Sequence, residues 1–276
     1  MNSCNSRTHR FLLQIAEDLS SGDVSFPTYL DAAVRIRLAL EKPDLTIDTL
    51  ARVLLTEPLV SAKVIRLANS AALNPSGREV TDVKTAVMRV GFSAIRALAV
   101  SVALQQLLRE KDMAPFMESA RALWQHSLEV AAASFVVARR LTKIRPDEAL
   151  FAGLVHDIGH FYLLSQIARN PEIARDDEEL YRVLDEWHCS IGHAVLSALE
   201  TPESILTAVK DHETAFADQS PTSLGQVLYI ANTLAPTWNP FAGASSYRSS
   251  PVLESVASII GESSDELNSI IAALGH

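Results

Sequence analysis

A histidine and an aspartate stand side by side in residues 154–160, which read LVHDIGH. They lie within an apolar run over residues 149–164, so a fold that buries this run also buries His156 and Asp157. Burying an imidazole next to a carboxylate costs free energy unless both groups are hydrogen-bonded or bind a metal ion. The pair is therefore a candidate for a buried site, provided that other helices bring partners to it.

Four other segments with helical periodicity each place one ligand-type side chain on an otherwise apolar face. These side chains are His126, His188, His212 and Asn232. A single histidine on an apolar face is usually a hydrogen-bonded core residue, and that interpretation stays open for each of them. Six of the eight histidines nevertheless fall between residues 126 and 212. Neutral imidazoles and a carboxylate that converge from separate helices suit iron, zinc, manganese or nickel.

We therefore predict a metal site formed by His126, His156, Asp157, His188 and His212. If the site is catalytic, activity should depend on Asp157, because this carboxylate would hold the metal ion that activates a water molecule.

Three neighbouring residues are assigned lesser roles. His160 lies one helical turn after His156 and is expected to support a ligand rather than to bind the metal. His193 falls off the apolar face and is expected at the surface. Cys189 is expected to be a packing residue, since the adjacent His188 fits the apolar face better.

Almost every periodic segment has helical spacing, and no strand alternation stands out, which predicts an all-α fold. The expected helices cover residues 11–19, 27–40, 47–57, 58–71, 83–90, 93–108, 116–142, 147–168, 177–199, 203–214, 222–235, 251–260 and 264–274. The segment 93–108 is apolar almost all round and should be central. The pattern pauses at residues 111–115, which predicts an N-terminal helical subdomain, 1–112, and a second one, 113–276.

The composition argues against several classes of protein. A net charge of −9 disfavours a nucleic-acid binder, and it favours a bend between core helices over a DNA-binding helix-turn-helix around Gly91. Two cysteines without a CxxC motif indicate a reducing compartment. No run of eighteen apolar residues is present, and residues 1–10 do not read as a signal peptide. We therefore expect a cytoplasmic protein without a membrane span.

Several segments, in order along the chain, resemble the HDOD family, the HD-related output domains of bacterial signalling proteins within the HD phosphohydrolase superfamily. They are residues 57–71 (EPLVSAKVIRLANSA), 85–91 (TAVMRVG), 153–159 (GLVHDIG), His188 with Gly192, and 202–212. The resemblance spans residues 15–235 as one HDOD unit. It implies an all-α fold in which an HD-like helical domain packs against an N-terminal helical bundle.

The resemblance also implies a regulatory role, since HDOD members often lack a complete catalytic set. Such domains are often joined to receiver or cyclic-dinucleotide domains, and this chain carries none, so we expect a stand-alone regulator. Within the motif NSA, Asn69 and Ser70 are expected to bond to backbone and to lock a helix junction rather than to bind a ligand.

The chain departs from the hydrolases of the superfamily at several positions. The final metal-binding aspartate is matched by Asn232, which is a weaker ligand and carries no charge. The lysine that follows the His-Asp pair in the related HD-GYP phosphodiesterases is matched by His160. Their paired histidines are matched by Asp211 and His212, and their Gly-Tyr-Pro motif is absent. The metal ligands are thus mostly kept, whereas the catalytic set is incomplete.

These features favour a signalling protein that binds a partner protein or a small ligand and has no enzymatic activity. The alternative is a metal-dependent phosphohydrolase acting on a nucleotide or a cyclic dinucleotide. In that case a basic residue should meet the phosphate, and the nearest in sequence are Lys143, Arg145 and Lys210. A metal or redox sensor without turnover is a third interpretation.

Overall fold

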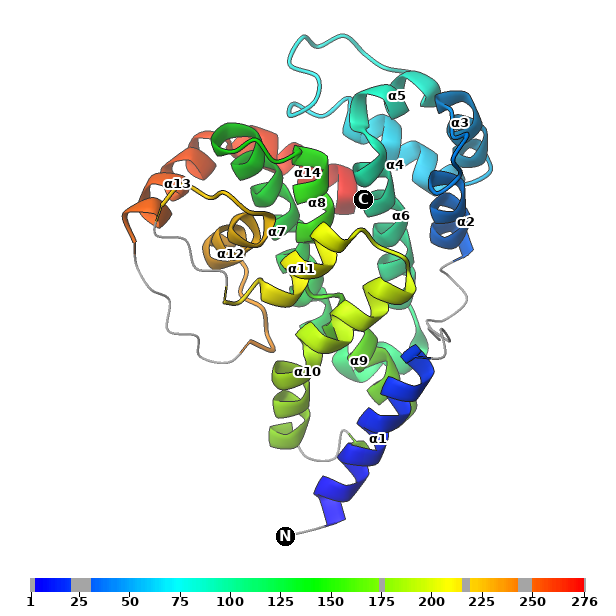
Figure 1. Cartoon of the computed structure of the whole chain (residues 1–276), viewed down its shortest axis with the longest axis vertical. Coiled ribbons are helices and arrows are strands. Elements are labelled where there is room, and N and C mark those ends of the chain that lie inside the picture. Colours follow the sequence, from blue (N-terminus) through cyan, green and yellow to red (C-terminus); the bar gives the residue numbers. More distant parts are fainter. Residues whose placement is uncertain (1–2, 21–30, 174–176, 215–218, 243–249, 276) are drawn as a thin grey trace.

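The computed structural model describes residues 3–20, 31–173, 177–214, 219–242 and 250–275. Within these residues every regular element is a helix, so the predicted all-α fold is confirmed (Figure 1). The elements are α1 (Ser3–Ser20), α2 (Asp31–Leu40), α3 (Ile47–Leu55), α4 (Pro58–Ala68), α5 (Val83–Val90), α6 (Phe92–Leu107), the 3₁₀ helix η2 (Lys111–Phe116), α7 (Met117–Leu141), α8 (Pro146–Val155), α9 (Ile158–Arg169), α10 (Asp177–Ala198), α11 (Glu203–Asp211), α12 (Leu224–Leu234), α13 (Pro251–Glu262) and α14 (Ser264–Gly275). The expected start of the second helix, residues 27–30, lies outside the described residues.

Local sequence signals explain where the N-terminal helices begin and bend. Thr46 and Thr49 form a reciprocal capping box at the start of α3, and the Asp82 carboxylate caps α5. Gly91 joins α5 to α6 with a φ of 86°, a conformation that favours glycine. The two helices are bent by 109° at this point. As predicted, the junction is a tight bend between helices that both contribute to the core.

Helix α6 is central to the fold, as its apolar sequence predicts. It contacts α2, α4, α5, α8 and α14, and residues on all of its faces are buried. In the described part of the chain no single helix is long and apolar enough to cross a membrane, and only the bent pair α5–α6 meets that criterion by length and composition.

Two helices pack across the predicted subdomain boundary, which itself stays a prediction. Helix α1 lies along α10, where the Thr8 hydroxyl donates to Glu179 over 2.6 Å (Figure 1). At the other end of the chain, α14 packs on α7 and also on α4, where Lys63 donates to the Leu274 carbonyl. Each half of the chain is therefore covered in part by a helix from the other half.

The expectation of one continuous helix over residues 147–168 is wrong. Helix α8 ends at Val155 and α9 begins at Ile158, so His156 and Asp157 form the turn between them. The backbone of Asp157, with φ −101° and ψ 17°, leaves the helical conformation here. The turn lets both side chains point into the same site, whereas successive side chains of one straight helix project about 100° apart.

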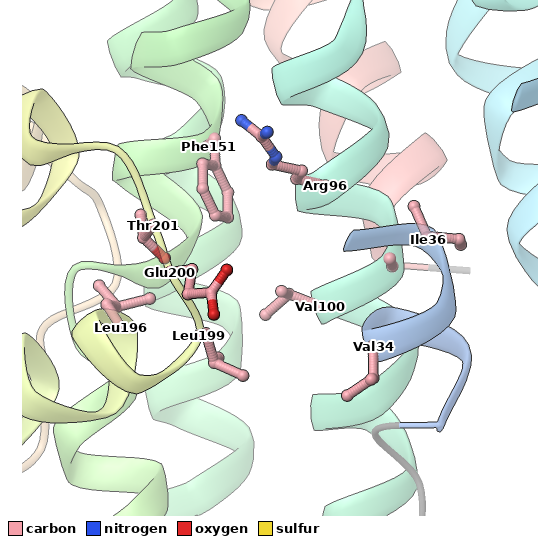
Figure 2. Close-up of a pocket in the computed structure, with 10 residues that line it drawn as sticks. Val34, Ile36, Arg96, Val100, Phe151, Leu196, Leu199, Glu200 and Thr201 are labelled. Atoms are coloured by element: carbon pink, nitrogen blue, oxygen red, sulfur yellow. The ribbon is translucent and has the colours of Figure 1, made fainter. Parts of the chain in front are cut away.

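A pocket lies where the N-terminal helices pack against the later ones (Figure 2). Its cavity is small, about 40 Å³, and is mostly apolar. Its walls come from α2, α6, α8 and the end of α10, through side chains that include Val34, Val100, Phe151 and Leu199. Arg96 and Glu200 are the charged residues that line it, and Glu200 has a left-handed φ of 50°.

Candidate metal centre

The turn between α8 and α9 approaches α10 closely because of one glycine. A Cβ added to Gly159 would lie 2.0 Å from the His188 carbonyl oxygen and 2.7 Å from the Gly192 amide nitrogen. Only glycine permits this backbone contact. The contact stacks the His160 ring on the His188 ring, with centroids 4.0 Å apart and planes at 15°. Gly159 therefore brings α10 against the His-Asp turn.

All five predicted ligand residues are brought together and are almost completely buried. His126 comes from α7, His156 and Asp157 from the turn, His188 from α10, and His212 from the end of α11. Their exposed fractions lie between 0% and 2%. We call them, together with His160, the histidine–aspartate cluster.

Asp157 is the centre of the cluster, because its two carboxylate oxygens face different histidines. Oδ2 lies 3.1 Å from His156 Nε2 and 3.7 Å from His126 Nε2. Oδ1 lies 3.3 Å from His160 Nδ1 and 3.8 Å from His212 Nε2. One carboxylate thus stands between two pairs of imidazoles, an arrangement that suits a metal ion on either side of it.

Backbone carbonyls determine which nitrogen of each predicted histidine ligand faces inward. In each of the four rings Nδ1 contacts a backbone oxygen: His126 with Thr237 at 2.7 Å, His156 with Gly153 at 2.7 Å, His188 with Asp185 at 2.8 Å, and His212 with Val209 at 2.7 Å. A carbonyl oxygen can only accept, so each Nδ1 carries the hydrogen. In a neutral ring the Nε2 lone pair is then free, as it is in metal-binding histidines oriented by a second hydrogen bond.

The Nε2 atoms of the histidines and the carboxylate oxygens of Asp157 are suited to bind a metal cation. The Nε2 atoms of His126 and His156 lie 3.3 Å apart, and both face Asp157 Oδ2. When each neutral ring carries its hydrogen on Nδ1, the two Nε2 atoms and the carboxylate oxygen direct only lone pairs at one another, and these lone pairs repel. A positive ion between them would remove this repulsion. His160 Nε2 is a further buried nitrogen without a hydrogen-bond partner in the described part of the chain. His126, His156 and Asp157 form one compact set of three potential ligands, and Asp157, His160 and His188 form another.

The pKa values of three histidines of the cluster agree with neutral rings around an ionised carboxylate. Burial lowers the pKa of His126, and it lowers the pKa values of His160 and His212 to about 4. Burial alone would raise the pKa of Asp157, but the adjacent His156 and His160 hold it well below its usual range. Neutral imidazole and ionised carboxylate are the protonation states that bind metals.

Two asparagines complete the cluster, and sequence analysis identified only one of them. Asn232, which the resemblance matches to the superfamily's final aspartate, acts on His126 and favours its protonated form, although burial outweighs this effect and lowers the pKa of His126. Asn239 is buried, and its amide donates to Asp157 Oδ2 over 2.8 Å while its own oxygen accepts the Phe241 amide N–H. Asn239 follows α12 in an irregular segment, so no helical periodicity could reveal it.

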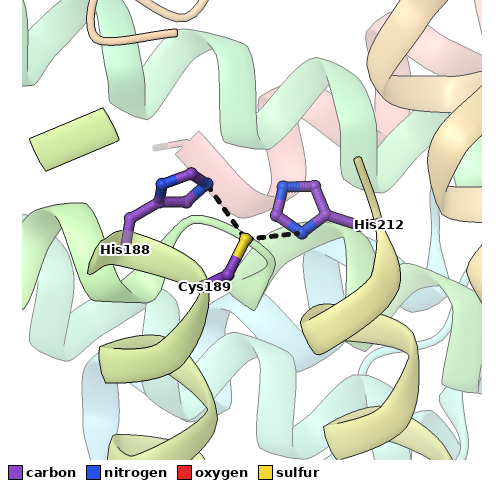
Figure 3. A group of neighbouring side chains, drawn as sticks. All are labelled: His188, Cys189 and His212. Carbon is purple, nitrogen blue, oxygen red and sulfur yellow. Dashed lines mark hydrogen bonds between the residues drawn. The ribbon is translucent and has the colours of Figure 1, made fainter. Parts of the chain in front are cut away.

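Cys189 contacts the cluster, contrary to the expectation that it only fills space. Its Sγ lies 3.3 Å from His188 Nε2 and 3.8 Å from His212 Nδ1 (Figure 3). Glu213 Oε1 lies 3.4 Å from His188 Nε2, and this side chain is 43% exposed. Burial would lower the pKa of His188, but Cys189 and Glu213 outweigh burial and raise it. The cluster therefore meets solvent on the side of Glu213.

The remaining residues singled out from the sequence lie outside this set of contacts. His193 is half-buried on α10, not fully at the surface as expected. Lys143 and Lys210 are exposed, and Arg145 pairs with Asp147 at 2.7 Å. No contact between these three basic residues and the cluster is found among the described residues.

Comparison with known proteins identifies the family. The HDOD domain profile matches residues 26–215, which is more than half of the chain, so the protein belongs to the HDOD family. The resemblance noted in the sequence is thereby confirmed. No protein with curated annotation matches the chain significantly.

Solved structures share the fold over almost the whole chain. A protein from Shewanella amazonensis SB2B, provisionally named a metal-dependent phosphohydrolase, has 23% identity and a TM-score of 0.71, with 98% of this chain and 99% of that one covered. An HDOD protein of unknown function from Geobacter sulfurreducens has 22% identity and a TM-score of 0.61, with 96% and 97% covered. A protein from Marinobacter aquaeolei VT8, provisionally named a signal transduction protein, has 20% identity and a TM-score of 0.59, with 92% and 60% covered.

Proposed function

We propose that this HDOD protein is a regulatory module whose histidine–aspartate cluster holds a divalent metal ion, and that it acts by binding a partner protein or small ligand rather than by turnover. The observation that carries the metal proposal is the orientation of the imidazoles. Three Nδ1–H groups are bonded to backbone, which leaves the Nε2 lone pairs of His126, His156 and His212 directed toward Asp157. Iron, zinc, manganese and nickel all accept such a donor set.

Two features favour binding over hydrolysis. Asn232 contributes no charge next to His126, where the hydrolases of the superfamily have a carboxylate, so metal affinity and activation of a bound water should both be weaker. In addition, the side chains of His126, His156 and Asp157 are at most 2% exposed. A phosphoester would have to displace protein atoms to reach them.

A metal-dependent phosphohydrolase acting on a nucleotide or cyclic dinucleotide is the second candidate. It is supported by the five predicted ligand residues, which all lie in one cluster, and by the provisional name of the Shewanella relative. A bound metal would supply Lewis acidity and lower the pKa of a water molecule. In this chain Asn239 would orient Asp157, and Thr237 would orient His126.

A sensor in which the metal serves regulation alone is a third candidate, supported by the Cys189 thiol beside His188. It predicts metal-dependent stability or partner affinity without turnover, because a ligand that binds only the folded state stabilises it.

The metal proposal is tested by elemental analysis of protein purified without added metal and without a histidine tag. We expect near-stoichiometric iron, zinc, manganese or nickel in the wild type and none in His156→Ala/Asp157→Ala. The matched control is His193→Ala, which removes a histidine of α10 outside the cluster and should keep the metal. A wild-type protein without metal would contradict the proposal and leave the histidines as core residues.

A phosphoester panel then separates the binding role from the hydrolase. Metal-loaded protein is incubated with nucleotides and cyclic dinucleotides, and we expect no turnover. Hydrolysis that disappears in Asp157→Ala would instead establish the second candidate.

A further inference from the structure

A basic pocket lies between α4 and α6, beside the C-terminal end of α14 and apart from the histidine–aspartate cluster. Its cavity has a volume of about 190 Å³, enough for a small anionic group. Lys63, Arg66 and Arg109 line it together with the amides of Gln105 and Gln106, and its other lining residues are apolar. No acidic side chain lines it, although the protein carries a net charge of −9.

The end of α14 holds three of these side chains in place. Lys63 Nζ donates to the Leu274 carbonyl over 2.6 Å, and Arg66 donates to the Ala272 carbonyl over 3.3 Å. Gln105 donates to the Gly275 carbonyl. Each of these bonds uses one donor, whereas an ammonium group has three N–H donors and a guanidinium group has five. The pocket therefore keeps unused donors on side chains that are already positioned.

The cations of this pocket lack the carboxylate partners that other arginines of the protein have. Arg139, Arg140 and Arg145 each lie within 3.4 Å of a carboxylate oxygen. Among the described residues, Lys63, Arg66 and Arg109 form no such pair. This is costly for Lys63, because a charged side chain that is only 5% exposed has lost most of its contact with water. Burial and the nearby charge of Arg66 lower the pKa of Lys63 to about 8. A bound anion would offset both effects.

We propose that the pocket binds a phosphate group, carried by a soluble metabolite or by a lipid headgroup. Arginine presents N–H groups in a planar fork that matches phosphate oxygens, and a lysine ammonium adds a point charge. Leu59, which is 62% exposed, and Val102 form an apolar wall beside the cations, suited to an organic group attached to the phosphate. The site is independent of the proposed metal and does not rest on the proposed function.

Calorimetric titration of the full chain at low salt tests the site, with inorganic pyrophosphate as the soluble probe. A parallel arm measures co-sedimentation with vesicles that contain phosphatidic acid. The variant is Arg66→Gln/Arg109→Gln, which spares the buried Lys63. The control is Arg121→Gln, which makes the same kind of substitution once, at an exposed position on α7 that does not line the pocket. Thermal melts verify that every variant is folded.

We expect saturable binding in one arm, which identifies the source of the phosphate, and a loss of affinity of at least about tenfold in the double variant. The Arg121→Gln protein should bind like the wild type. The proposal is overturned if neither arm gives saturable binding, or if the double variant binds as tightly as the wild type. It is also overturned if binding is lost in Asp157→Ala, because the phosphate would then bind at the cluster.

Discussion

Two sets of buried polar side chains, one in each half of the protein, have different partners. In the N-terminal helices they bond to backbone: Ser61 Oγ donates to the Leu54 carbonyl over 2.6 Å, and Ser101 Oγ to the Leu98 carbonyl over 2.8 Å. In the later helices the buried side chains of His126, His156 and Asp157 face one another. The first arrangement satisfies polar groups and stabilises the fold, whereas the second leaves lone pairs that require a further partner.

Asn69 illustrates the structural arrangement. Its amide nitrogen donates to the Val80 carbonyl over 2.7 Å, and its oxygen accepts the Val80 N–H over 2.8 Å. The side chain thus replaces a pair of backbone hydrogen bonds between the end of α4 and the segment before α5. The predicted role at a helix junction is confirmed for Asn69, while the Ser70 hydroxyl has no hydrogen-bond partner among the described residues.

The largest expected effect is the loss of metal affinity in Asp157→Asn. The substitution keeps the size of the side chain but removes the charge between two pairs of imidazoles, so affinity should fall by at least about 100-fold. Competition with a chromogenic chelator measures it. Asn69→Ala is the control from the other half and should bind metal like the wild type. Unchanged affinity in Asp157→Asn would mean that the metal binds elsewhere. The buried polar side chains of the later helices would then be structural, like those of the N-terminal helices.

Acid should destabilise the metal-free protein through the cluster. The folded-state pKa values of His126, His160 and His212 lie below the usual 6.5, so the unfolded state binds more protons between about pH 4 and pH 6.5. Their contribution to stability is complete above pH 6.5 and is lost as the pH falls toward 4. His188, whose pKa is raised, acts in the opposite sense and mainly above pH 6.5.

Urea unfolding at a series of pH values measures this effect. The midpoint of the metal-free protein should decrease steadily from pH 6.5 to pH 4.5. A midpoint that does not change over this range would mean that the histidines are protonated in the folded state as readily as in the unfolded state.

The Asn69→Ala substitution should destabilise the protein without changing its metal content. It removes two hydrogen bonds and leaves the N–H and carbonyl of Val80 without those partners, which costs about 2 kcal/mol. The free energy of unfolding in urea measures the loss. Asn170→Ala, which removes an exposed amide, is the control and should change stability by less than about 0.5 kcal/mol. A loss of metal in Asn69→Ala would mean that metal binding also depends on the N-terminal helices.

A smaller effect is expected for Asn239→Ala, which removes the hydrogen bond that orients Asp157 without removing a proposed ligand. Metal affinity should fall by about tenfold, the lower end of the range for groups that position a ligand. The chelator assay used for Asp157→Asn gives the comparison. A loss as large as that in Asp157→Asn would mean that Asn239 itself binds the metal.

Much of the fold and of the candidate site follows from periodicity. A helical repeat of 3.6 residues determines which side chains share a face, so His126, His188 and His212 could be assigned to the buried faces of separate helices. The same pattern predicted α7 to within a residue at each end and identified α6 as central. These features depend on residues close together in the chain.

Other features depend on contacts between distant segments, and only the tertiary structure decided them. The break between α8 and α9 coincides with the approach of Gly159 to the His188 carbonyl, a contact between residues far apart in the chain. Asn239 reaches Asp157 from an irregular segment, and Cys189 meets His212 because α10 packs against α11. Periodicity in the sequence predicted most of the helices and the faces that they bury, because hydrophobic burial follows the helical repeat. Which atoms meet at the centre was decided by how the helices pack.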